Sequence, residues 1–117
     1  MKKQKSGVII LTSSGAGVDG SSSSYAYGSS KGGVHGLSMI LMDKLSKYGV
    51  RVHDILPGSV DTPLKNSQIE NTRDITGNEA QYKNIKNNLV KPKGIAEIIL
   101  FMCSDNAYLL KGSIRTQ

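Results

Sequence analysis

Three stretches of hydrophobic residues are short and rich in β-branched side chains, which predicts β-strands. Residues 7–11 form the first and run into a Thr-Ser-Ser-Gly sequence, as expected of a strand that is buried on both faces and ends in a polar loop. Residues 50–56 form the second, and Pro57-Gly58 ends it. A last short strand is predicted over residues 113–116.

Two longer stretches carry hydrophobic residues at spacings of three and four, the period of an amphipathic helix. The first covers residues 27–48 and is followed by Gly49, which is typical of a helix end. The second covers residues 93–104. The hydrophobic positions that define the two patterns are Val34, Leu37, Leu41 and Leu45 in the first helix and Ile95, Ile98, Ile99 and Met102, expected to face inward, in the second.

The remaining stretches are polar. Residues 15–24 are almost entirely glycine and serine, which predicts a loop, and residues 61–88 are predicted to form a mobile segment with short helices. Because a predicted helix lies between the first two strands, the connection is a parallel crossover, which is nearly always right-handed. The predicted fold class is therefore α/β with a parallel sheet.

Composition and charge fit an ordinary globular protein. The chain has 117 residues, of which 38% are hydrophobic and 21% charged, so a single domain over residues 1–117 is expected. The formal net charge is +6, but the lysines are scattered and only Lys2, Lys3 and Lys5 form a dense cluster. With no Trp and no basic stretch interleaved with aromatic residues, a nucleic-acid partner is not expected.

Other classes of protein are also disfavoured. The single cysteine, Cys103, excludes an internal disulfide and is expected to be a small buried residue in a reducing compartment. The hydrophobic runs are far shorter than the roughly 18 residues that span a bilayer, so no membrane association is expected and the cytoplasm is the predicted location. His35 and His53 lack the partner spacing of a metal site or catalytic triad, and no metal is expected.

Tyr27 and Lys31 are candidates for proton-transfer chemistry. They are four residues apart on the first predicted helix, which places both side chains on one face, one turn apart. Tyrosine ordinarily ionises near pH 10, and a neighbouring ammonium is what would make a phenolate accessible near neutral pH. Ser14 follows the first strand, at the edge where a parallel sheet presents side chains to a ligand. Its hydroxyl can donate a hydrogen bond to a substrate oxygen.

These residues match the signature of a known family. Ser14 precedes Tyr27 by thirteen residues, and Tyr27-Gly-Ser-Ser-Lys31 follows, which resembles the Ser and Tyr-x-x-x-Lys motif of short-chain dehydrogenases/reductases. Residues 51–63, Arg-Val-His-Asp-Ile-Leu-Pro-Gly-Ser-Val-Asp-Thr-Pro, resemble the family's next strand and its Pro-Gly loop. Residues 93–114 resemble its closing helix and final strand.

The resemblance implies a partial Rossmann-like parallel sheet with flanking helices, the C-terminal half of a doubly wound fold. It also implies NAD(P)-dependent interconversion of a small-molecule alcohol and a carbonyl compound. Tyr27 would exchange a proton with the substrate oxygen, Ser14 would orient that oxygen, and Lys31 would stabilise the phenolate and bind the nicotinamide ribose. The residues implied in binding the cofactor, NAD or NADP, are Tyr27, Lys31, Pro57, Gly58, Val60 and Thr62.

Two nearby features compete with this interpretation. Tyr25 is followed four residues later by a serine instead of a lysine, so we interpret it as a loop or substrate-wall residue. Residues 15–20 spell Gly-x-Gly-x-x-Gly, but serines follow directly and no acidic residue ends a second strand about 20 positions on. We therefore do not interpret this motif as a dinucleotide fingerprint.

The resemblance covers only the C-terminal half of a family member, and within it residues 61–88 would form the substrate loop. The glycine-rich first turn and the residue that selects the ribose have no counterpart here. We expect a truncated enzyme that binds cofactor poorly by itself. The alternative is an inactive remnant that acts as an interaction module, forming a homo-oligomer or pairing with an intact homologue through the helix at residues 27–48.

Overall fold

The computed structural model describes residues 1–20 and 24–116, and its centre is a parallel β-sheet. The strands are β1 (Gly7–Thr12), β2 (Val50–Leu56) and β3 (Ser113–Arg115), in the spatial order β1-β2-β3. This arrangement confirms the predicted α/β class and the parallel crossover between the first two strands. Part of the predicted loop at residues 15–24, namely residues 21–23, lies outside the described residues.

β2 is the central strand and holds most of the core. Residues 52–56 are all buried, and Ile55 has no exposed surface. β1 is different, because within the described sheet it has a neighbour on one side only, and its residues are half-buried. The prediction that the first strand is buried on both faces is therefore wrong.

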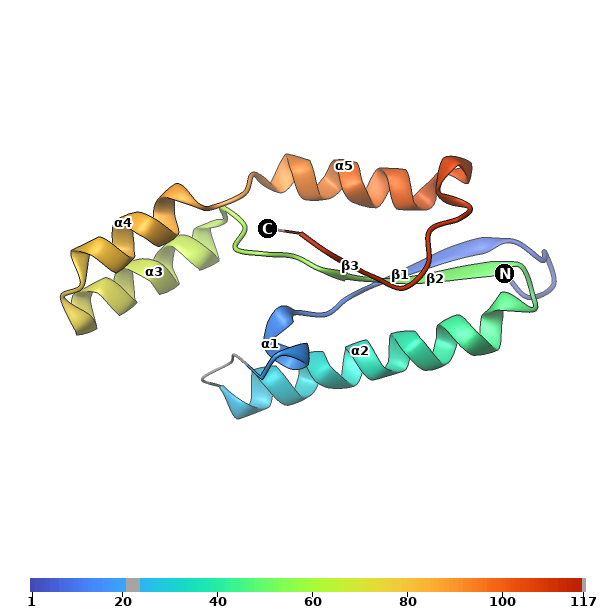
Figure 1. Cartoon of the computed structure of the whole chain (residues 1–117), viewed down its shortest axis with the longest axis horizontal. Coiled ribbons are helices and arrows are strands. Elements are labelled where there is room, and N and C mark those ends of the chain that lie inside the picture. Colours follow the sequence, from blue (N-terminus) through green and yellow to red (C-terminus); the bar gives the residue numbers. More distant parts are fainter. Residues whose placement is uncertain (21–23, 117) are drawn as a thin grey trace.

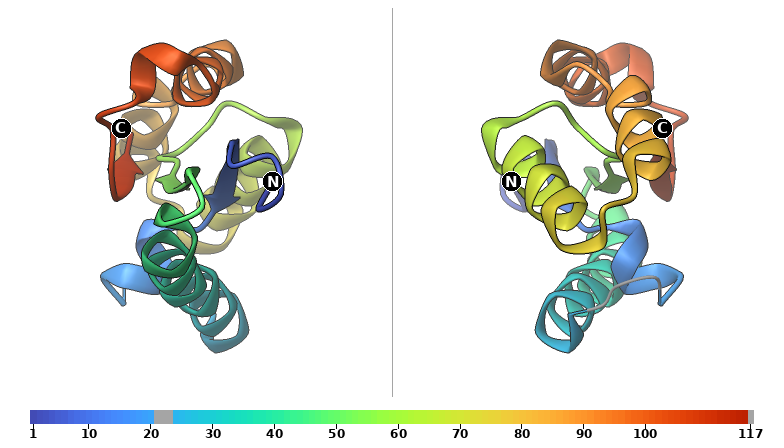
Figure 2. Two further views of the ribbon diagram at one scale, coloured as in Figure 1. Left: turned by 90° about the vertical axis from the view of Figure 1, so that its right-hand side faces the viewer. Right: turned by 90° about the vertical axis from the view of Figure 1, so that its left-hand side faces the viewer.

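Helices cover both faces of the sheet (Figures 1 and 2). α2 (Tyr25–Ser46) lies on one face, and α5 (Pro92–Cys103), followed by the short η1 (Asp105–Ala107), lies on the other. The sequence predicted both long helices, although α2 begins two residues earlier than expected. Gly49 lies in the turn between α2 and β2 and has a φ of 67°, a backbone conformation that favours glycine.

A short helix occupies part of the segment that was predicted to be loop. α1 (Gly15–Val18) follows β1 directly and packs against α2. At their crossing a Cβ on Gly17 would overlap the backbone nitrogen of Gly32 and lie 2.6 Å from the carbonyl carbon of Lys31. The glycines of this segment therefore permit two helices to approach closely, and a loop prediction from composition alone missed that.

A buried polar cluster joins α2 to the sheet. Asp54 of β2 has no exposed surface, and its Oδ2 is 2.6 Å from Nδ1 of His35 on α2. The Ser113 hydroxyl of β3 also donates to this oxygen, at 3.3 Å. His35 therefore has a specific partner that its sequence spacing did not indicate, and removing one member of such a buried pair typically costs about 3–5 kcal/mol.

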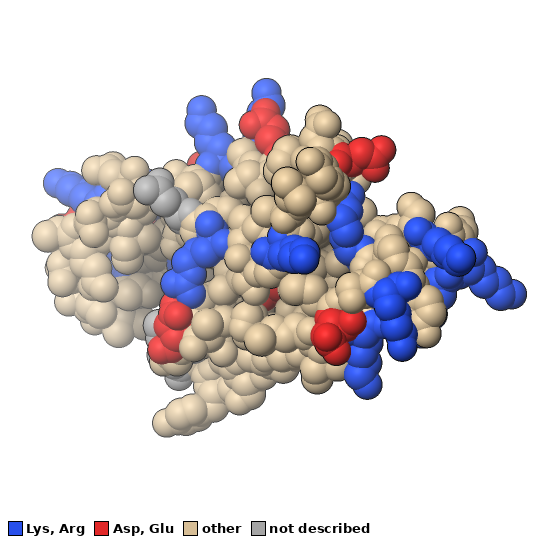
Figure 3. Space-filling model, turned by 45° about the vertical axis from the view of Figure 1, so that its right-hand side comes forward, with Lys and Arg blue, Asp and Glu red and all other residues tan. Residues whose placement is uncertain are grey.

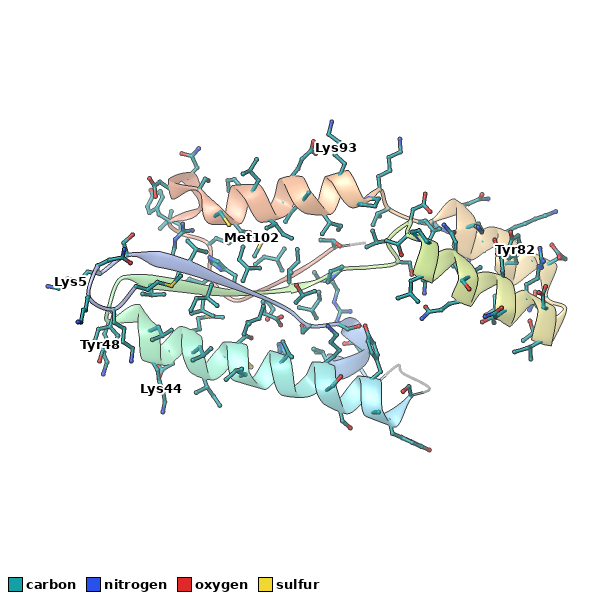
Figure 4. All side chains as sticks on the ribbon, turned by 180° about the vertical axis from the view of Figure 1, so that it is seen from behind. Lys5, Lys44, Tyr48, Tyr82, Lys93 and Met102 are labelled. Carbon is teal, nitrogen blue, oxygen red and sulfur yellow. The ribbon has the colours of Figure 1, made fainter. Side chains whose placement is uncertain are left out.

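The opposite face of β2 is tied to α5. The Arg51 guanidinium donates to the carbonyl oxygens of Met102, Ser104 and Ala107, at 2.8 to 3.1 Å. These carbonyls lie at the end of α5 and beyond it, where a helix leaves acceptors unsatisfied. Met102 points from α5 toward the sheet and is fully buried (Figure 4). Arg51 therefore provides hydrogen bonds to the carbonyl groups at the end of α5. Because Arg51 belongs to β2, these bonds also hold α5 against the sheet.

Not every hydrophobic residue of the two helical patterns is buried. Met102 is, and Ile95, Ile98 and Ile99 are half-buried, as predicted for the inward face of α5. On α2, however, Leu37 is 48% exposed. Cys103 is also exposed, because it lies next to Met102 on the outer side of α5, so the expectation that it is buried is wrong.

The segment after β2 forms a helical hairpin of α3 (Pro63–Thr76) and α4 (Glu79–Asn87). Gly77, with a φ of 65°, makes the turn between the two helices. The base of the hairpin is closed by an isolated parallel bridge between Val60 and Val90. The hairpin extends past the end of the sheet, which gives the molecule its elongated extents of 55 × 28 × 19 Å (Figure 1).

Most charged residues in the described part of the chain lie at the surface, with Asp54 as the buried exception. Basic and acidic side chains are interspersed over most of the face shown in Figure 3, with a denser group of basic ones toward one end. Lys2, Lys3 and Lys5 are exposed, as predicted. In the described part of the chain, no helix has the length and hydrophobicity needed to cross a membrane.

The crossing of α1 and α2 gives a first testable prediction. Gly17→Ala should lower the free energy of unfolding by about 1–3 kcal/mol, because the added methyl group meets backbone atoms that cannot move independently. Gly33→Ala is the matched control on α2, since a Cβ there meets nothing within 4 Å, and it should stabilise the protein by up to about 1 kcal/mol. Chemical denaturation measures both, and equal effects of the two substitutions would contradict the close approach.

A second prediction concerns His53, which is 1% exposed and has no hydrogen-bond partner for either ring nitrogen among the described residues. Burial, together with the Arg51 charge, lowers the pKa of His53 from its ordinary value of 6.5. The unfolded chain therefore takes up this proton first as the pH falls. Stability is complete above about pH 6.5 and should decrease below it, by at most about 1.4 kcal/mol per pH unit. His53→Asn should flatten this dependence in denaturation measured from pH 7.5 to 5, and an unchanged slope would disprove the assignment.

Candidate active site

The candidate site lies where β1 and β2 end side by side. The pairing of Thr12 with Ile55 is continued by a hydrogen bond from the Ser13 N–H to the Ile55 carbonyl, at 3.0 Å. Ser14 follows as the N-cap of α1, and its Oγ accepts a hydrogen bond from the Ala16 N–H at 3.3 Å. The residues that follow β1 and β2 therefore lie at the same edge of the sheet.

Tyr27 and Lys31 reach this edge from α2. The Lys31 ammonium donates to the Thr12 carbonyl, at 2.9 Å, and lies 5.9 Å from the centre of the Tyr27 ring. Tyr27 is 47% exposed. The ammonium is therefore held by the last residue of β1 while it stays beside the tyrosine, which couples the position of the helix to that of the strand.

One groove of about 1030 Å³ brings most of the candidate residues together. Lys31 is not in its wall, although its ammonium lies over the ring of Tyr27. Tyr25 is 93% exposed and does not contribute to the wall either. The candidate residues from the sequence that line the groove are Ser14, Tyr27, Pro57, Gly58, Val60 and Thr62.

The Pro57–Thr62 loop crosses the groove after β2. The Ser59 carbonyl accepts from the Val90 N–H at 2.9 Å, and the Asp61 N–H donates to the Val90 carbonyl at 2.8 Å. Because both flanking groups point toward Val90, the N–H and carbonyl of Val60 point the opposite way. Among the described residues they have no hydrogen-bond partner. They could bind an amide group of a ligand.

The far wall of the groove is formed by the α3–α4 hairpin. Thr62 begins α3 as its N-cap, accepting a hydrogen bond from the Lys65 N–H at 3.2 Å. The ring of Tyr82, on α4, lies 4.8 Å from the Arg73 guanidinium (Figure 4). The hairpin residues that line the groove are Leu64, Lys65, Gln68, Ile69, Asn71, Thr72, Arg73, Thr76, Asn78, Gln81, Tyr82 and Ile85.

An ion pair that the sequence did not indicate holds the segment after Ser14. Asp19 pairs with Arg115 of β3 through both carboxylate oxygens, at 2.8 and 3.0 Å. The hydrogen bond from Arg115 and its charge lower the pKa of the Asp19 carboxyl. The two residues are 96 positions apart in sequence, so no local pattern could have linked them. The pair connects the last strand to the end of α1.

In this structure the glycine motif at residues 15–20 contributes to the packing of α1 against α2. Gly15 does begin a helix, contrary to the argument made from the sequence, but α1 has only four residues. Gly17 is used for the contact with Gly32 described above. Within residues 1–20 and 24–116, no group of three or more His, Cys, Asp or Glu side chains could hold a metal ion.

Comparison with known proteins identifies the relatives of this chain. Residues 1–73 match the family model described as short chain dehydrogenase. Tropinone reductase-like 1 of Erythroxylum coca is 34% identical over 112 residues, covering 96% of this chain and 41% of the relative. Ipsdienol dehydrogenase of Ips pini is 34% identical over 115 residues, covering 93% and 44%. The chain therefore spans less than half the length of these curated relatives.

Solved structures agree with this result. Levodione reductase superimposes with a TM-score of 0.87 at 24% identity, covering 100% of this chain and 47% of that structure. Actinorhodin polyketide ketoreductase with NADPH superimposes with a TM-score of 0.85 at 25% identity, covering 97% and 47%. The fold of this chain thus corresponds to about half of each structure, a partial Rossmann-like sheet with its flanking helices.

The Asp19–Arg115 pair gives a third prediction. In an NMR titration, the wild-type Asp19 carboxyl should have a pKa below its ordinary value of 3.8, and Arg115→Gln should return the pKa toward that value. The ion pair between Asp19 and Arg115 should therefore be fully formed above about pH 3.8 and be lost as the pH falls through the lowered pKa of Asp19. Lys111→Gln removes a positive charge four residues before Arg115 that makes no ion pair with Asp19, and serves as the control. An equal rise in both variants would mean that general surface charge, and not this pair, causes the shift.

Proposed function

Because the chain belongs to the short-chain dehydrogenase family, we propose that it carries the proton-transfer residues of an NAD(P)-dependent oxidoreductase that interconverts an alcohol and a carbonyl compound. The observation that carries the proposal is the shared groove of Ser14 and Tyr27, with the Lys31 ammonium over the tyrosine ring. The matched relatives are more than twice as long as the matched region, so the activity of a whole enzyme is part of the proposal.

Tyr27 is the proposed general acid and base. Its phenol would donate a proton to the carbonyl oxygen during reduction and accept one from the alcohol during oxidation. The Ser14 hydroxyl would donate a hydrogen bond to the same oxygen and so orient it. Since Ser14 already caps α1 with an Oγ lone pair, its hydroxyl proton is free to point toward the groove.

Lys31 is the proposed electrostatic partner of Tyr27. Its ammonium would stabilise the negative charge that develops on the phenol oxygen as the proton leaves. The ammonium uses one of its three N–H groups to donate to the Thr12 carbonyl, which holds the side chain in place. Two N–H groups remain for a ligand hydroxyl, such as one of a ribose. The single fixed contact to β1 supports a positioning role for the strand end.

The groove loop suits a nicotinamide cofactor. When bound, NAD or NADP supplies the hydride for reduction or accepts it in oxidation. The unpartnered N–H and carbonyl of Val60 match the complementary groups of a carboxamide, and Thr62, Pro57 and Gly58 lie beside them in the groove wall. These residues support binding of the nicotinamide end only, which is why we expect weak binding of the whole cofactor by this chain alone.

The remaining assignments follow the same reasoning. We propose that residues 1–117 are one partial catalytic domain and that residues 61–88 act as its substrate loop, which the position of α3 and α4 along the groove supports. The proposed substrate is a small-molecule alcohol or carbonyl compound. A cytoplasmic location is supported by the sequence arguments alone.

A second candidate function is an interaction module without catalysis. α2 exposes Leu37, Met39 and Ile40, each 48–57% accessible, and of these Leu37 and Ile40 lie about one turn apart on the same face. Burying this surface against a second copy or an intact homologue would remove hydrophobic area from water. This observation favours association through α2, with or without activity.

A fourth prediction tests the proton-transfer role. In an NAD(P)H-linked assay with a panel of ketones and aldehydes, Tyr27→Phe should lower kcat about 100-fold or more, because the proton donor is lost while the ring remains. Tyr25→Phe, two residues away and 93% exposed, should leave kcat within about twofold.

Full activity of Tyr27→Phe, or equal losses in both variants, would disprove the assignment of Tyr27. Calorimetry with NADH and NADPH decides between the two candidate functions. If neither cofactor binds, no carbonyl is reduced, and the chain self-associates in sedimentation equilibrium, the interaction module replaces the enzyme.

A further inference from the structure

We propose that the groove selects substrates carrying an anionic group, a carboxylate or a phosphate, and that Lys65 on α3 binds this group. The inference deepens the proposed function and rests on it, because it assigns the substrate class of the same groove. It is carried by the charged residues of the α3–α4 hairpin and by which of them have a partner.

The groove wall contains no acidic side chain among the described residues. Residues 61–88 include four acidic residues, and none of them lines the groove. Asp61 accepts a hydrogen bond from Asn66 at 2.7 Å, and Glu70 pairs with Lys86 at 3.5 Å. Asp74 and Glu79 both face Arg73, at 2.9 and 3.8 Å. Three of the four therefore have a cationic partner, Asp61 faces a neutral amide, and the described groove wall itself holds no carboxylate that would neutralise Lys65.

The basic residues of the same hairpin differ in whether they have an acidic partner. Arg73 and Lys86 have the acidic partners just described, so their charges are compensated within the protein. Lys83 is exposed and lies outside the groove wall. Lys65 is half-buried, lines the groove, and makes no ion pair among the described residues. Its ammonium is thus the uncompensated charge that a ligand in the groove would meet.

Neutral side chains elsewhere in the groove wall point to the same ligand chemistry. Gln68, Asn71 and Gln81 line the groove, and their side-chain amides have no hydrogen-bond partner among the described residues. Gln68 lies one turn after Lys65 on α3, so the two side chains share a face. An ammonium and several amides offer many donors, which suits a ligand rich in acceptor oxygens.

The position of Lys65 connects this charge to the candidate chemistry. It lies in the first turn of α3, three residues after Thr62, where the helix dipole adds partial positive charge. Thr62 belongs to the proposed nicotinamide loop, so an anion at Lys65 would sit beside the reacting end of the groove. The phosphates of the cofactor are the rival anion, and we assign Lys65 to the substrate because the groove wall continues past Lys65 with unpartnered amides further along α3 and on α4.

The experiment uses hydroxy acids of increasing length, each paired with the diol of the same carbon skeleton. The probes are lactate, 3-hydroxybutyrate and 4-hydroxypentanoate against 1,2-propanediol, 1,3-butanediol and 1,4-pentanediol. NMR titration of the chain measures the affinity of each probe and the residues it perturbs. At least one acid should bind about tenfold tighter than its diol and should perturb Lys65 and Gln68.

Variants separate Lys65 from general charge. Lys65→Gln should weaken binding of that acid about tenfold and leave the diol unchanged, whereas Lys83→Gln should leave both unchanged. Equal affinities for acid and diol in the wild type, or equal losses in the two variants, would overturn the inference. So would displacement of the acid from Lys65 by nicotinamide mononucleotide, because Lys65 would then serve the cofactor phosphate.

The perturbed residues distinguish this inference from the proposed function. An acid that perturbs Lys65 and Gln68 but not Ser14 or Tyr27 supports the anion site and contradicts the proposed reaction centre. Acids and diols that perturb Ser14 and Tyr27 equally, with no response at Lys65, support the reaction centre and overturn the anion site.

Discussion

The parallel pairing of β1 with β2 is the constraint on which the rest of the structure depends. Because the two strands run in the same direction and in register from Gly7 and Val50 onward, their carboxyl ends meet at one edge of the sheet. Ser14 and the Pro57–Thr62 loop leave from that edge, although they are more than 40 residues apart in the sequence. An antiparallel pairing would place them at opposite ends of the molecule.

The pairing alone would not position Tyr27, because α2 must also be held at one height over the sheet. Polar contacts do this at successive turns of the helix. Lys31 binds the end of β1, and His35, one turn further on, binds the buried Asp54 of β2. A charged group in the core is costly unless it is paired, so Asp54 favours the one helix position that brings His35 to it. The buried pair therefore supports the geometry of the candidate site without touching it.

The proposed proton-transfer residues and the proposed recognition residues lie on different kinds of structure. The proposed proton-transfer residues lie on a central sheet edge and a long packed helix, where their positions are well determined. The proposed recognition residues lie on the α3–α4 hairpin, which extends past the sheet and is joined at its base by one bridge. Changes in the hairpin can therefore alter the ligand with little effect on the sheet and α2.

The main elements and the family could be predicted from the sequence alone. Hydrophobic periodicity predicted β2, α2 and α5 closely, since it reflects which side of each element is apolar, and the spacing of Ser14, Tyr27 and Lys31 indicated the family. Contacts between residues that are distant in the sequence could not be predicted in this way. The partners of His35, Asp19 and Arg51, the helix at Gly15–Val18 and the exposure of Cys103 depend on residues distant in sequence that meet only in the folded chain. The same holds for the uncompensated charge of Lys65, because periodicity reports one element at a time, whereas pairing of charges depends on how the elements pack.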